Sequence, residues 1–331
     1  MCLQIYNTYY RIHKYIFIYL EAYMEKKKLA VILCSTSNQM FAVGNVLIGI
    51  KKHFSLPEKE YDIILYISGI INEKDEKALK QIYQNIIINH YQSPIEKSMK
   101  NANCTLMWSL MTFARYEAFT LLYKYNKVLY LDTDVLIQKD IINLLDINKD
   151  ISVSYEHTNI KGNVENKLLA ENFYENKYNL NLKVFNAGVF LINNSIKNPD
   201  EIKEWCYKMS TEWRMTDQPI LNLMVQEFNL EVNDFSNKYN RYYFTNNSNN
   251  EDAYILHTAW EKKFWNGSDC EEWNENNKKW VELGGIPYDP EYVAKKIKEI
   301  NKIAWWIPNK KLRDIYRVRQ ASKFGFRWHL Y

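Results

Sequence analysis

Residues 128–137, VLYLDTDVLI, carry two aspartates one residue apart at the end of an apolar run. Side chains alternate between the faces of a strand, so Asp132 and Asp134 are expected to point the same way at the strand's carboxyl end, where open α/β sheets bind ligands. Two carboxylates with no basic neighbour in the sequence repel each other unless a cation lies between them. Aspartate oxygens suit Mg²⁺ or Mn²⁺, whose remaining positions take water and phosphate oxygens. The pattern therefore favours a metal site for a diphosphate-linked substrate.

Three later segments carry further polar residues, and each also has a purely structural explanation. Residues 185–193, FNAGVFLIN, offer an amide and a small-residue opening, or simply a tight strand entrance. Residues 216–223, TDQPILNL, offer two polar side chains, or only a helix N-cap followed by proline. Residues 255–265, ILHTAWEKKFW, offer a histidine and a lysine pair that could bind an anion, or a buried structural histidine. The candidates are Asn186, Ala187, Gly188, Asp217, Gln218, His257 and Lys263.

The elements that must position these residues follow from hydrophobic periodicity. Apolar runs predict strands at residues 29–35, 62–68, 128–137, 152–155 and 184–191. Helical spacing predicts helices at residues 40–53, 73–87, 105–125, 202–213 and 218–226. Strands that alternate with helices indicate an α/β fold with one mixed, mainly parallel sheet flanked by helices.

Composition limits the class of protein. A chain of 331 residues with 47% apolar and 25% charged residues can form one large α/β domain with appendages. It has 9 glycines and neither a Gly-x-Gly-x-x-Gly nor a P-loop motif, which argues against dinucleotide and P-loop chemistry. Its 5 cysteines are scattered, which favours a reducing compartment and a cytoplasmic protein.

The two ends differ from the middle of the sequence. The apolar stretch at residues 9–23 is interrupted by four polar or charged side chains, so it is no convincing membrane span. Residues 1–27 are interpreted as an N-terminal extension or a mis-assigned start, residues 28–285 as the catalytic domain, and residues 286–331 as a basic aromatic helical tail. From residue 302 to the end, eight lysines and arginines stand against one aspartate, among seven aromatic residues. This mixture suits an anionic membrane surface or a solvated terminal helix, and no nucleic-acid motif accompanies it.

Taken in order, these segments resemble glycosyltransferase family eight, which includes glycogenin and bacterial lipopolysaccharide galactosyl- and glucosyltransferases. The family pattern is a strand with Asp-x-Asp, then Phe-Asn-Ala/Ser-Gly-Val, then Asp-Gln-x-x-x-Leu-Asn, then His-Phe-x-Gly-x-x-Lys-Pro-Trp. The resemblance spans residues 28–265. It implies a GT-A-like fold, a UDP-sugar donor, a glycan or lipid-linked acceptor, bound Mn²⁺ or Mg²⁺, and retention of the anomeric configuration.

The resemblance also implies roles for single residues. Asp132, Asp134 and His257 would bind the metal, and Lys263 would hold the donor pyrophosphate. Arg115 would lie beside the donor sugar or ribose, and Asn186, Ala187, Gly188 and Glu156 would contact the sugar. Asp217 and Gln218 would lie near the anomeric carbon. Thr36 and Asn38 stand near the place of a family aspartate that binds uracil, so they are candidate contacts to base or ribose.

The sequence departs from the family pattern where Trp260 replaces a glycine and Phe264 a proline. Two alternatives to a transferase remain at the level of sequence. A haloacid-dehalogenase-type phosphatase also uses Asp-x-Asp, but that family places the motif on its first strand, whereas two predicted strands precede it here. The other alternative is a sugar-nucleotide-binding scaffold without catalysis.

Overall fold

A seven-stranded sheet, in the order β3-β2-β1-β4-β7-β6-β8, forms the centre of the molecule. The computed structural model describes residues 26–99, 109–163, 177–244, 248–259 and 263–323. Neighbouring strands run parallel, except that β7 is antiparallel to both β4 and β6. The predicted mixed, mainly parallel sheet is thus confirmed. The strands are β1 (Lys27–Thr36), β2 (Tyr61–Ser68), β3 (Ile87–His90), β4 (Tyr125–Leu131), β6 (Ile151–Asn159), β7 (Lys183–Asn193) and β8 (Val232–Asp234).

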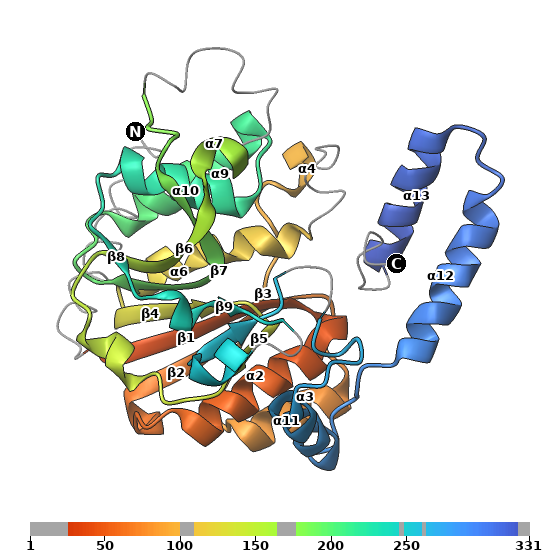
Figure 1. The fold of residues 1–331 in the computed structure, drawn as a ribbon, viewed down its shortest axis with the longest axis horizontal. Helices are drawn as coiled ribbons and strands as arrows, with labels where there is room; N and C mark the ends of the chain where they lie inside the picture. The colour runs from red at the N-terminus through yellow and green to blue at the C-terminus, as the bar shows by residue number, and fades with distance from the viewer. Residues whose placement is uncertain (1–25, 100–108, 164–176, 245–247, 260–262, 324–331) are drawn as a thin grey trace, which may run out of the picture.

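Helices cover both faces of this sheet (Figure 1). On one face lie α2 (Met40–His53), α3 (Glu73–Ile82) and α11 (Glu271–Glu282). On the other lie η3 (Leu110–Glu117), α6 (Ala118–Leu121), α9 (Pro199–Trp213) and α10 (Asp217–Glu227). Shorter helical segments are η1 (Ser37–Gln39), η2 (Glu58–Glu60), α4 (Glu96–Met99), η4 (Ile142–Asp146), α7 (Ile160–Asn163), η5 (Asn237–Tyr239) and η6 (Ser248–Asp252).

Strand β1 explains why its sequence is apolar without a break. Leu29, Val31 and Leu33 pack in the core that contains α2, whereas Ala30 and Ile32 pack in the core on the opposite face. A central strand covered on both sides has no solvated face, so its apolar residues need not alternate with polar ones. Burial of such side chains contributes about 1.5–3 kcal/mol each.

Two predicted elements differ from the structure. The predicted helix at residues 73–87 ends at Ile82, and the edge strand β3 follows it. The run of isoleucines at residues 86–88 is β-branched and pairs with β2, which outweighs the helical spacing before it. In place of the predicted helix at residues 105–125, the described part has the 3-10 helix η3, the single α-helical turn of α6, and the start of β4 at Tyr125.

After the strand β4 of the first sheet, the chain enters a second sheet of three strands. After β4 ends at Leu131, residues 132–134 turn, and β5 (Val135–Ile137) enters a sheet in the order β5-β10-β9. There β5 pairs antiparallel with β10 (Ile255–His257), which pairs in turn with β9 (Arg241–Tyr242). Val135 lies opposite His257 in this register, so the pairing brings the histidine to the turn that carries the aspartates.

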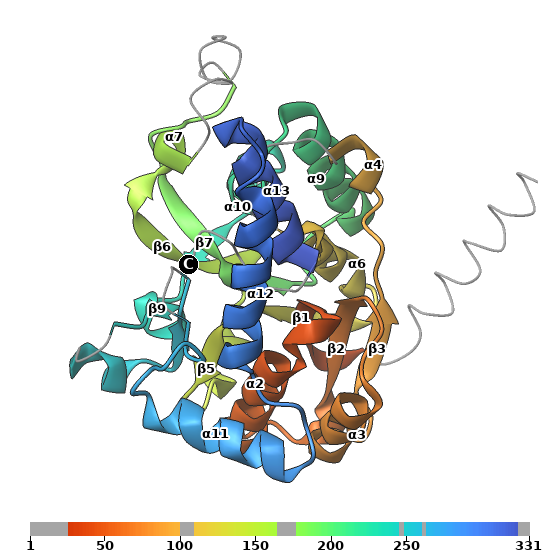
Figure 2. The same cartoon turned by 90° about the vertical axis from the view of Figure 1, so that its right-hand side faces the viewer.

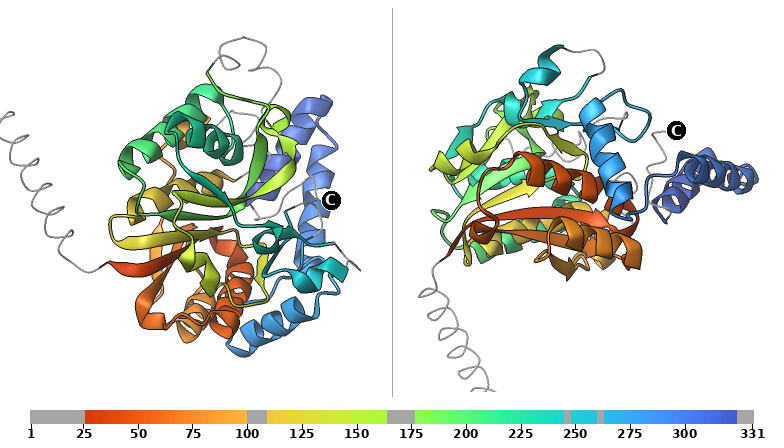
Figure 3. Two further views of the ribbon diagram at one scale, coloured as in Figure 1. Left: turned by 60° about the vertical axis from the view of Figure 1, so that its left-hand side comes forward. Right: turned by 90° about the horizontal axis from the view of Figure 1, so that it is seen from below.

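The C-terminal part of the described chain forms a helical hairpin of α12 (Pro290–Ala304) and α13 (Lys310–Lys323). Figure 1 shows its two helices side by side, to one side of the sheet and its covering helices, and in Figure 2, seen from that side, the hairpin lies in front of them. Viewed from below, the pair again projects from the rest of the domain (Figure 3). The helices meet through Val293, Ile300 and Ala321. Residues 1–25, most of the predicted N-terminal extension, lie outside the described residues.

Candidate active site

The turn between β4 and β5 holds the two aspartates together. The backbone amide of Asp132 donates to the carbonyl of Gly188 at 2.7 Å, which fixes the end of β4 against β7. The backbone amide of Thr258 donates to the carbonyl of Asp134 at 3.0 Å, which fixes the start of β5 against the end of β10. The carboxylates therefore converge because the chain turns between two sheets. The predicted cause, alternation along one continuous strand, is wrong.

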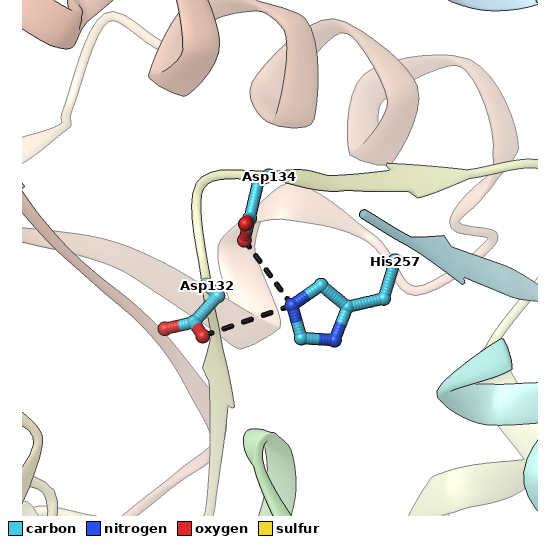
Figure 4. Close-up of side chains that lie close together, drawn as sticks. All are labelled: Asp132, Asp134 and His257. Atoms are coloured by element: carbon cyan, nitrogen blue, oxygen red, sulfur yellow. Dashed lines mark ion pairs between the residues drawn. The ribbon is translucent and has the colours of Figure 1, made fainter. Parts of the chain in front are cut away.

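His257 completes the cluster (Figure 4). Its Nε2 lies 3.2 Å from Oδ1 of Asp134 and 3.8 Å from Oδ2 of Asp132. The imidazole is only 2% exposed, because β10 is covered on both sides. Among the described residues, these three side chains form a group whose candidate ligand atoms all lie within 4.8 Å of one another.

The second oxygen of each carboxylate is already held by the protein. Oδ1 of Asp132 accepts hydrogen bonds from Nη2 of Arg115 at 3.0 Å and from the hydroxyl of Tyr130 at 2.6 Å. Oδ2 of Asp134 forms an ion pair with the ammonium of Lys263. Each aspartate thus directs one oxygen towards Nε2 of His257 and has the other fixed by a cation.

This arrangement fits a divalent cation. With metal–ligand bonds of about 2.1 Å, adjacent ligand atoms of an octahedral ion lie about 3.0 Å apart and opposite ones about 4.2 Å apart. The two distances from Nε2 fall within that range, at 3.2 and 3.8 Å. Two carboxylate oxygens and an imidazole suit Mn²⁺ and Mg²⁺, and also other first-row metals.

The neighbours of Asp134 keep its carboxylate ionised. Burial alone would raise the pKa of the Asp134 carboxyl, but Lys263 and His257 outweigh it and hold that pKa well below its usual range. The ammonium of Lys263 also donates to the carbonyl of Thr258. Lys263 is thus fixed beside the cluster by two oxygens.

Gly188 allows the closest approach in the site. A Cβ atom at this position would lie 2.3 Å from Cε1 of His257 and 2.8 Å from Oδ2 of Asp132. No side chain larger than hydrogen fits between His257 and Asp132, so the close approach of β7 to this cluster requires a glycine at position 188.

Arg115 lies deeper than the resemblance implies. Its side chain is only 8% exposed and forms ion pairs with Asp132 and, at 2.7 Å, with Asp217. It also donates to the carbonyl of Ala187 at 2.7 Å and lies over the ring of Tyr130. In the structure Arg115 bridges the carboxylates of Asp132 and Asp217. Its contact with a donor sugar stays a prediction.

Asp217 begins α10 and is buried. Its carboxylate accepts from the hydroxyl of Thr112 in addition to its ion pair with Arg115. Burial raises the pKa of the Asp217 carboxyl, while Arg115 acts in the opposite direction.

A second polar group surrounds Asn186 on β7. Its Nδ2 donates to Oε1 of Glu156 at 3.1 Å and to Oε1 of Gln218 at 3.3 Å. The backbone amide of Ala187 also donates to Oε1 of Gln218, at 3.2 Å, and the hydroxyl of Tyr242 donates to Glu156. The predicted sugar-contacting residues therefore form one connected hydrogen-bonded group, next to the metal cluster through Gly188.

Thr36 and Asn38 lie apart from these groups but at the same edge of the sheet. In the register of β1 with β4, Leu33 lies opposite Leu131, so the last residues of β1 lie beside the aspartate turn. The hydroxyl of Thr36 donates to Oδ1 of Asn38 at 2.6 Å. No described hydrogen bond joins them to the metal cluster, and they stay candidates for base or ribose contacts.

Several residues of the site were not predicted from the sequence. Asn240 accepts from or donates to Nδ1 of His257 across 2.8 Å, and Tyr242, Tyr130 and Thr112 hold the carboxylates described above. Tyr130 could have been found, since it lies two residues before Asp132 on the same strand face. Asn240 and Tyr242 belong to a polar loop and a two-residue strand that no sequence periodicity marks.

Comparison with known proteins identifies the family. The family model described as Glycosyl transferase family 8 matches residues 30–268, a range that includes every site residue described above. The chain belongs to glycosyl transferase family 8. It is therefore a glycosyltransferase, and the phosphatase alternative gains no support. Among proteins with curated descriptions, none matches the sequence.

Solved structures of several glycosyltransferases share this fold. The bifunctional glycosyltransferase WbbM superposes with a TM-score of 0.58 at 16% identity, over 79% of this chain and 52% of its own. The galactosyltransferase LgtC, in complex with donor and acceptor sugar analogues, gives 0.53 at 20% identity, over 80% of this chain and 99% of its own. GlyE from Streptococcus pneumoniae gives 0.51 at 20% identity, over 78% and 62%. This chain thus spans about half of the WbbM chain and nearly all of the LgtC chain.

One departure from the family motif has a structural explanation. Phe264, where the family has proline, is fully buried against Trp273 and Tyr243. It anchors the segment that carries Lys263 to α11. Trp260, at the family's glycine position, lies outside the described residues.

Proposed function

We propose that this glycosyltransferase is metal-dependent and retaining, and moves a hexose, galactose or glucose, from a UDP-sugar to a saccharide or lipid-linked acceptor. This transfer would serve the synthesis of cell-surface glycan or lipopolysaccharide. The observation that carries the proposal is the cluster of Asp132, Asp134 and His257, in which one oxygen of each carboxylate faces Nε2 of the histidine. The hexose, the uridine and the retention come from the family resemblance.

In this proposal, the metal ligands are Asp132, Asp134 and His257. The ion, Mn²⁺ or Mg²⁺, would stabilise the negative charge that develops on the leaving diphosphate. Lys263 has three N–H donors, and two of them point to Asp134 and the carbonyl of Thr258. The remaining N–H would donate to a phosphate oxygen of the donor.

The donor sugar would lie against Asn186, Ala187, Gly188 and Glu156. Asp217 and Gln218 would face its anomeric carbon, where positive charge develops in the transition state. Arg115 binds both Asp132 and Asp217, so it sets the metal side and the sugar side of the site relative to each other. Thr36 and Asn38 would contact the uracil or ribose at the end of β1.

A donor panel tests this function. Purified protein is incubated with UDP-galactose, UDP-glucose and other nucleotide sugars, with Mn²⁺, with Mg²⁺ and with EDTA, and release of UDP and free sugar is measured. We expect slow, metal-dependent UDP release from one UDP-hexose, accelerated by a glycan or lipid-linked acceptor. Release of inorganic phosphate instead would indicate a phosphatase, and tight donor binding without turnover would indicate a scaffold.

We also propose that residues 286–331 form a unit for association with the cytoplasmic face of a membrane, beside a catalytic domain at residues 28–285. At the tip of the hairpin, Trp305 and Trp306 are 74% and 81% exposed, next to exposed Lys310 and Lys311. Aromatic rings and lysines together suit the interface of an anionic bilayer. None of the described helices is both long and apolar enough to span a bilayer.

A further inference from the structure

A chain of hydrogen bonds runs from the backbone of β7 to the metal-site histidine. The amide N–H of Gly188 donates to the side chain of Asn186 at 2.9 Å. A backbone N–H can only donate, so the atom it meets is the oxygen Oδ1. Asn240 contacts the same oxygen at 3.0 Å and must therefore present its amide nitrogen there. The orientation of both amides is thus determined by one backbone group.

This orientation decides which nitrogen of His257 carries the proton. With Nδ2 of Asn240 on Asn186, its Oδ1 faces Nδ1 of His257 at 2.8 Å. An amide oxygen can only accept, so Nδ1 carries a hydrogen. In the neutral imidazole the lone pair is then on Nε2, which is the atom that faces Asp132 and Asp134.

The carboxylates alone would favour the opposite arrangement. A protonated Nε2 would donate to Oδ1 of Asp134 across 3.2 Å, and the lone pair would then face away from the cation site. His257, Asn240 and Asn186 are all buried, so water has little access to replace a lost partner of Nδ1.

We propose that Asn240 is a positioning residue of the metal site: it holds His257 in the Nδ1–H tautomer, so that Nε2 is offered to the cation. Asn186 acts through it by fixing the direction of its amide. Groups hydrogen-bonded to metal-binding histidines act in this way in many metalloproteins. The inference rests on the proposed function only for the identity of His257 as a metal ligand.

The tautomer can be measured without metal, donor or acceptor. In protein labelled with ¹⁵N-histidine, long-range ¹H–¹⁵N spectra at alkaline pH distinguish the two ring nitrogens, and a His257→Gln variant assigns the signals. We expect the proton on Nδ1 in the wild type and on Nε2 in Asn240→Leu. A wild-type His257 that carries its proton on Nε2 would overturn the proposal, whatever the variants do.

Metal affinity provides the second measurement, by titration with Mn²⁺ followed by electron paramagnetic resonance. Asn240→Leu should bind Mn²⁺ about 10–100-fold more weakly than the wild type. Asn240→Asp keeps an oxygen acceptor for Nδ1–H but loses the amide that donates to Asn186. The proton should therefore stay on Nδ1, and the affinity should fall less than in Asn240→Leu. The matched control is Asn45→Leu, which removes a buried asparagine of α2 whose side chain donates to the carbonyl of Phe41 in the same helix. This variant should leave Mn²⁺ binding unchanged.

The outcomes separate this inference from the proposed function. Asn240→Leu that binds Mn²⁺ like the wild type, with the proton still on Nδ1, would refute the positioning role. Protein that shows the expected tautomer and affinities but transfers no sugar would leave the positioning role intact and remove the proposed transfer activity.

Discussion

At the scale of single residues, Asp134 is the side chain whose change should separate chemistry from folding. Asp134→Asn keeps the shape and an acceptor oxygen for Lys263 but removes the charge that a divalent cation needs. We expect transfer to fall by at least about 100-fold, since even partners of metal ligands cost 10–100-fold when removed. Circular dichroism should be unchanged. The melting temperature should be lower, because the buried ammonium of Lys263 loses its ion pair.

The control for this change is Asp146→Asn, which neutralises an exposed aspartate in the same region of the sequence. Its activity and melting temperature should match those of the wild type. Treatment of the wild type with EDTA should abolish transfer, and Mn²⁺ or Mg²⁺ should restore it. Full activity in EDTA would contradict a metal-dependent mechanism.

Lys263 is expected to act on the donor diphosphate. Lys263→Ala should raise the donor KM and lower kcat, with a combined loss of about 2–3 kcal/mol for a charge-assisted contact. Mn²⁺ affinity in the absence of donor should not fall, because removal of a nearby cation does not disfavour a second cation. Steady-state kinetics and Mn²⁺ titration together distinguish a phosphate contact from a structural one.

The neighbouring Lys262→Ala is the matched control for that prediction, since only Lys263 has the family's offset from the histidine. Lys262 lies outside the described residues, so the comparison also tests the alignment of the motif. A larger loss in Lys262→Ala than in Lys263→Ala would show that the register of the histidine segment is wrong.

Residue types and order were enough to predict which charged groups share the site. Asp132, Asp134, His257 and Lys263 come together as the resemblance implies, although the last two follow the aspartates by more than a hundred positions. Asn240 could not be predicted, because its role depends on the direction of an amide that a backbone N–H fixes through Asn186. The order of polar residues in the loop around Asn240 does not predict the orientation of its side-chain amide.

At the scale of elements, the sequence predicted the strands of the sheet better than the junctions between them. An apolar run that continues on both sides of the aspartates looks like one strand. The structure divides it between two sheets, because Asp132 bonds to β7 whereas Asp134 bonds to the end of β10. These partners are distant in sequence, so local periodicity cannot show where the strand ends.

Gly188 on β7 packs directly against His257 and Asp132. Gly188→Ala would place a methyl group in contact with both His257 and Asp132, so the ligands must move apart. We expect a loss of stability of about 1–3 kcal/mol, as for other overpacked sites, and much weaker Mn²⁺ binding. Chemical denaturation and Mn²⁺ titration measure the two effects separately.

Gly162→Ala is the matched control on a surface helix. The nearest atom to a Cβ at that position is Oδ1 of Asn159 at 3.7 Å, which is ordinary contact. This variant should keep the stability and the metal affinity of the wild type. If Gly188→Ala binds Mn²⁺ as tightly as Gly162→Ala does, the close packing of β7 against the ligands has no functional role.

At the scale of the whole molecule, charge is distributed unevenly. The chain carries a net charge of +4, whereas residues 302–331 alone carry +7, so the remainder is acidic. The described part of this region is the last turn of α12 and all of α13, in the hairpin that projects beside the sheet (Figure 1). A basic, aromatic unit attached to an acidic domain would orient the enzyme on an anionic surface.

The hairpin tip should therefore bind anionic vesicles in a salt-dependent way. Each basic residue at such a surface contributes about 1 kcal/mol, so Lys310→Gln with Lys311→Gln should weaken binding by about 2 kcal/mol. Trp305→Ser with Trp306→Ser should weaken it further by removing interfacial rings. Sedimentation with vesicles of phosphatidylglycerol and phosphatidylcholine, at low and high salt, measures both effects, and high salt should release the wild type.

The control must change the same charge elsewhere on the molecule. Lys77→Gln with Lys80→Gln does so on α3, where both of these lysines are exposed and, within the described residues, form ion pairs with glutamates of the same helix. Their loss should not reduce vesicle binding. If both lysine pairs lower binding equally, attraction depends on total charge and not on the hairpin. If neither the lysine nor the tryptophan variants of the tip lower binding, the hairpin is a structural cap, and a soluble acceptor becomes the better expectation than a lipid-linked one.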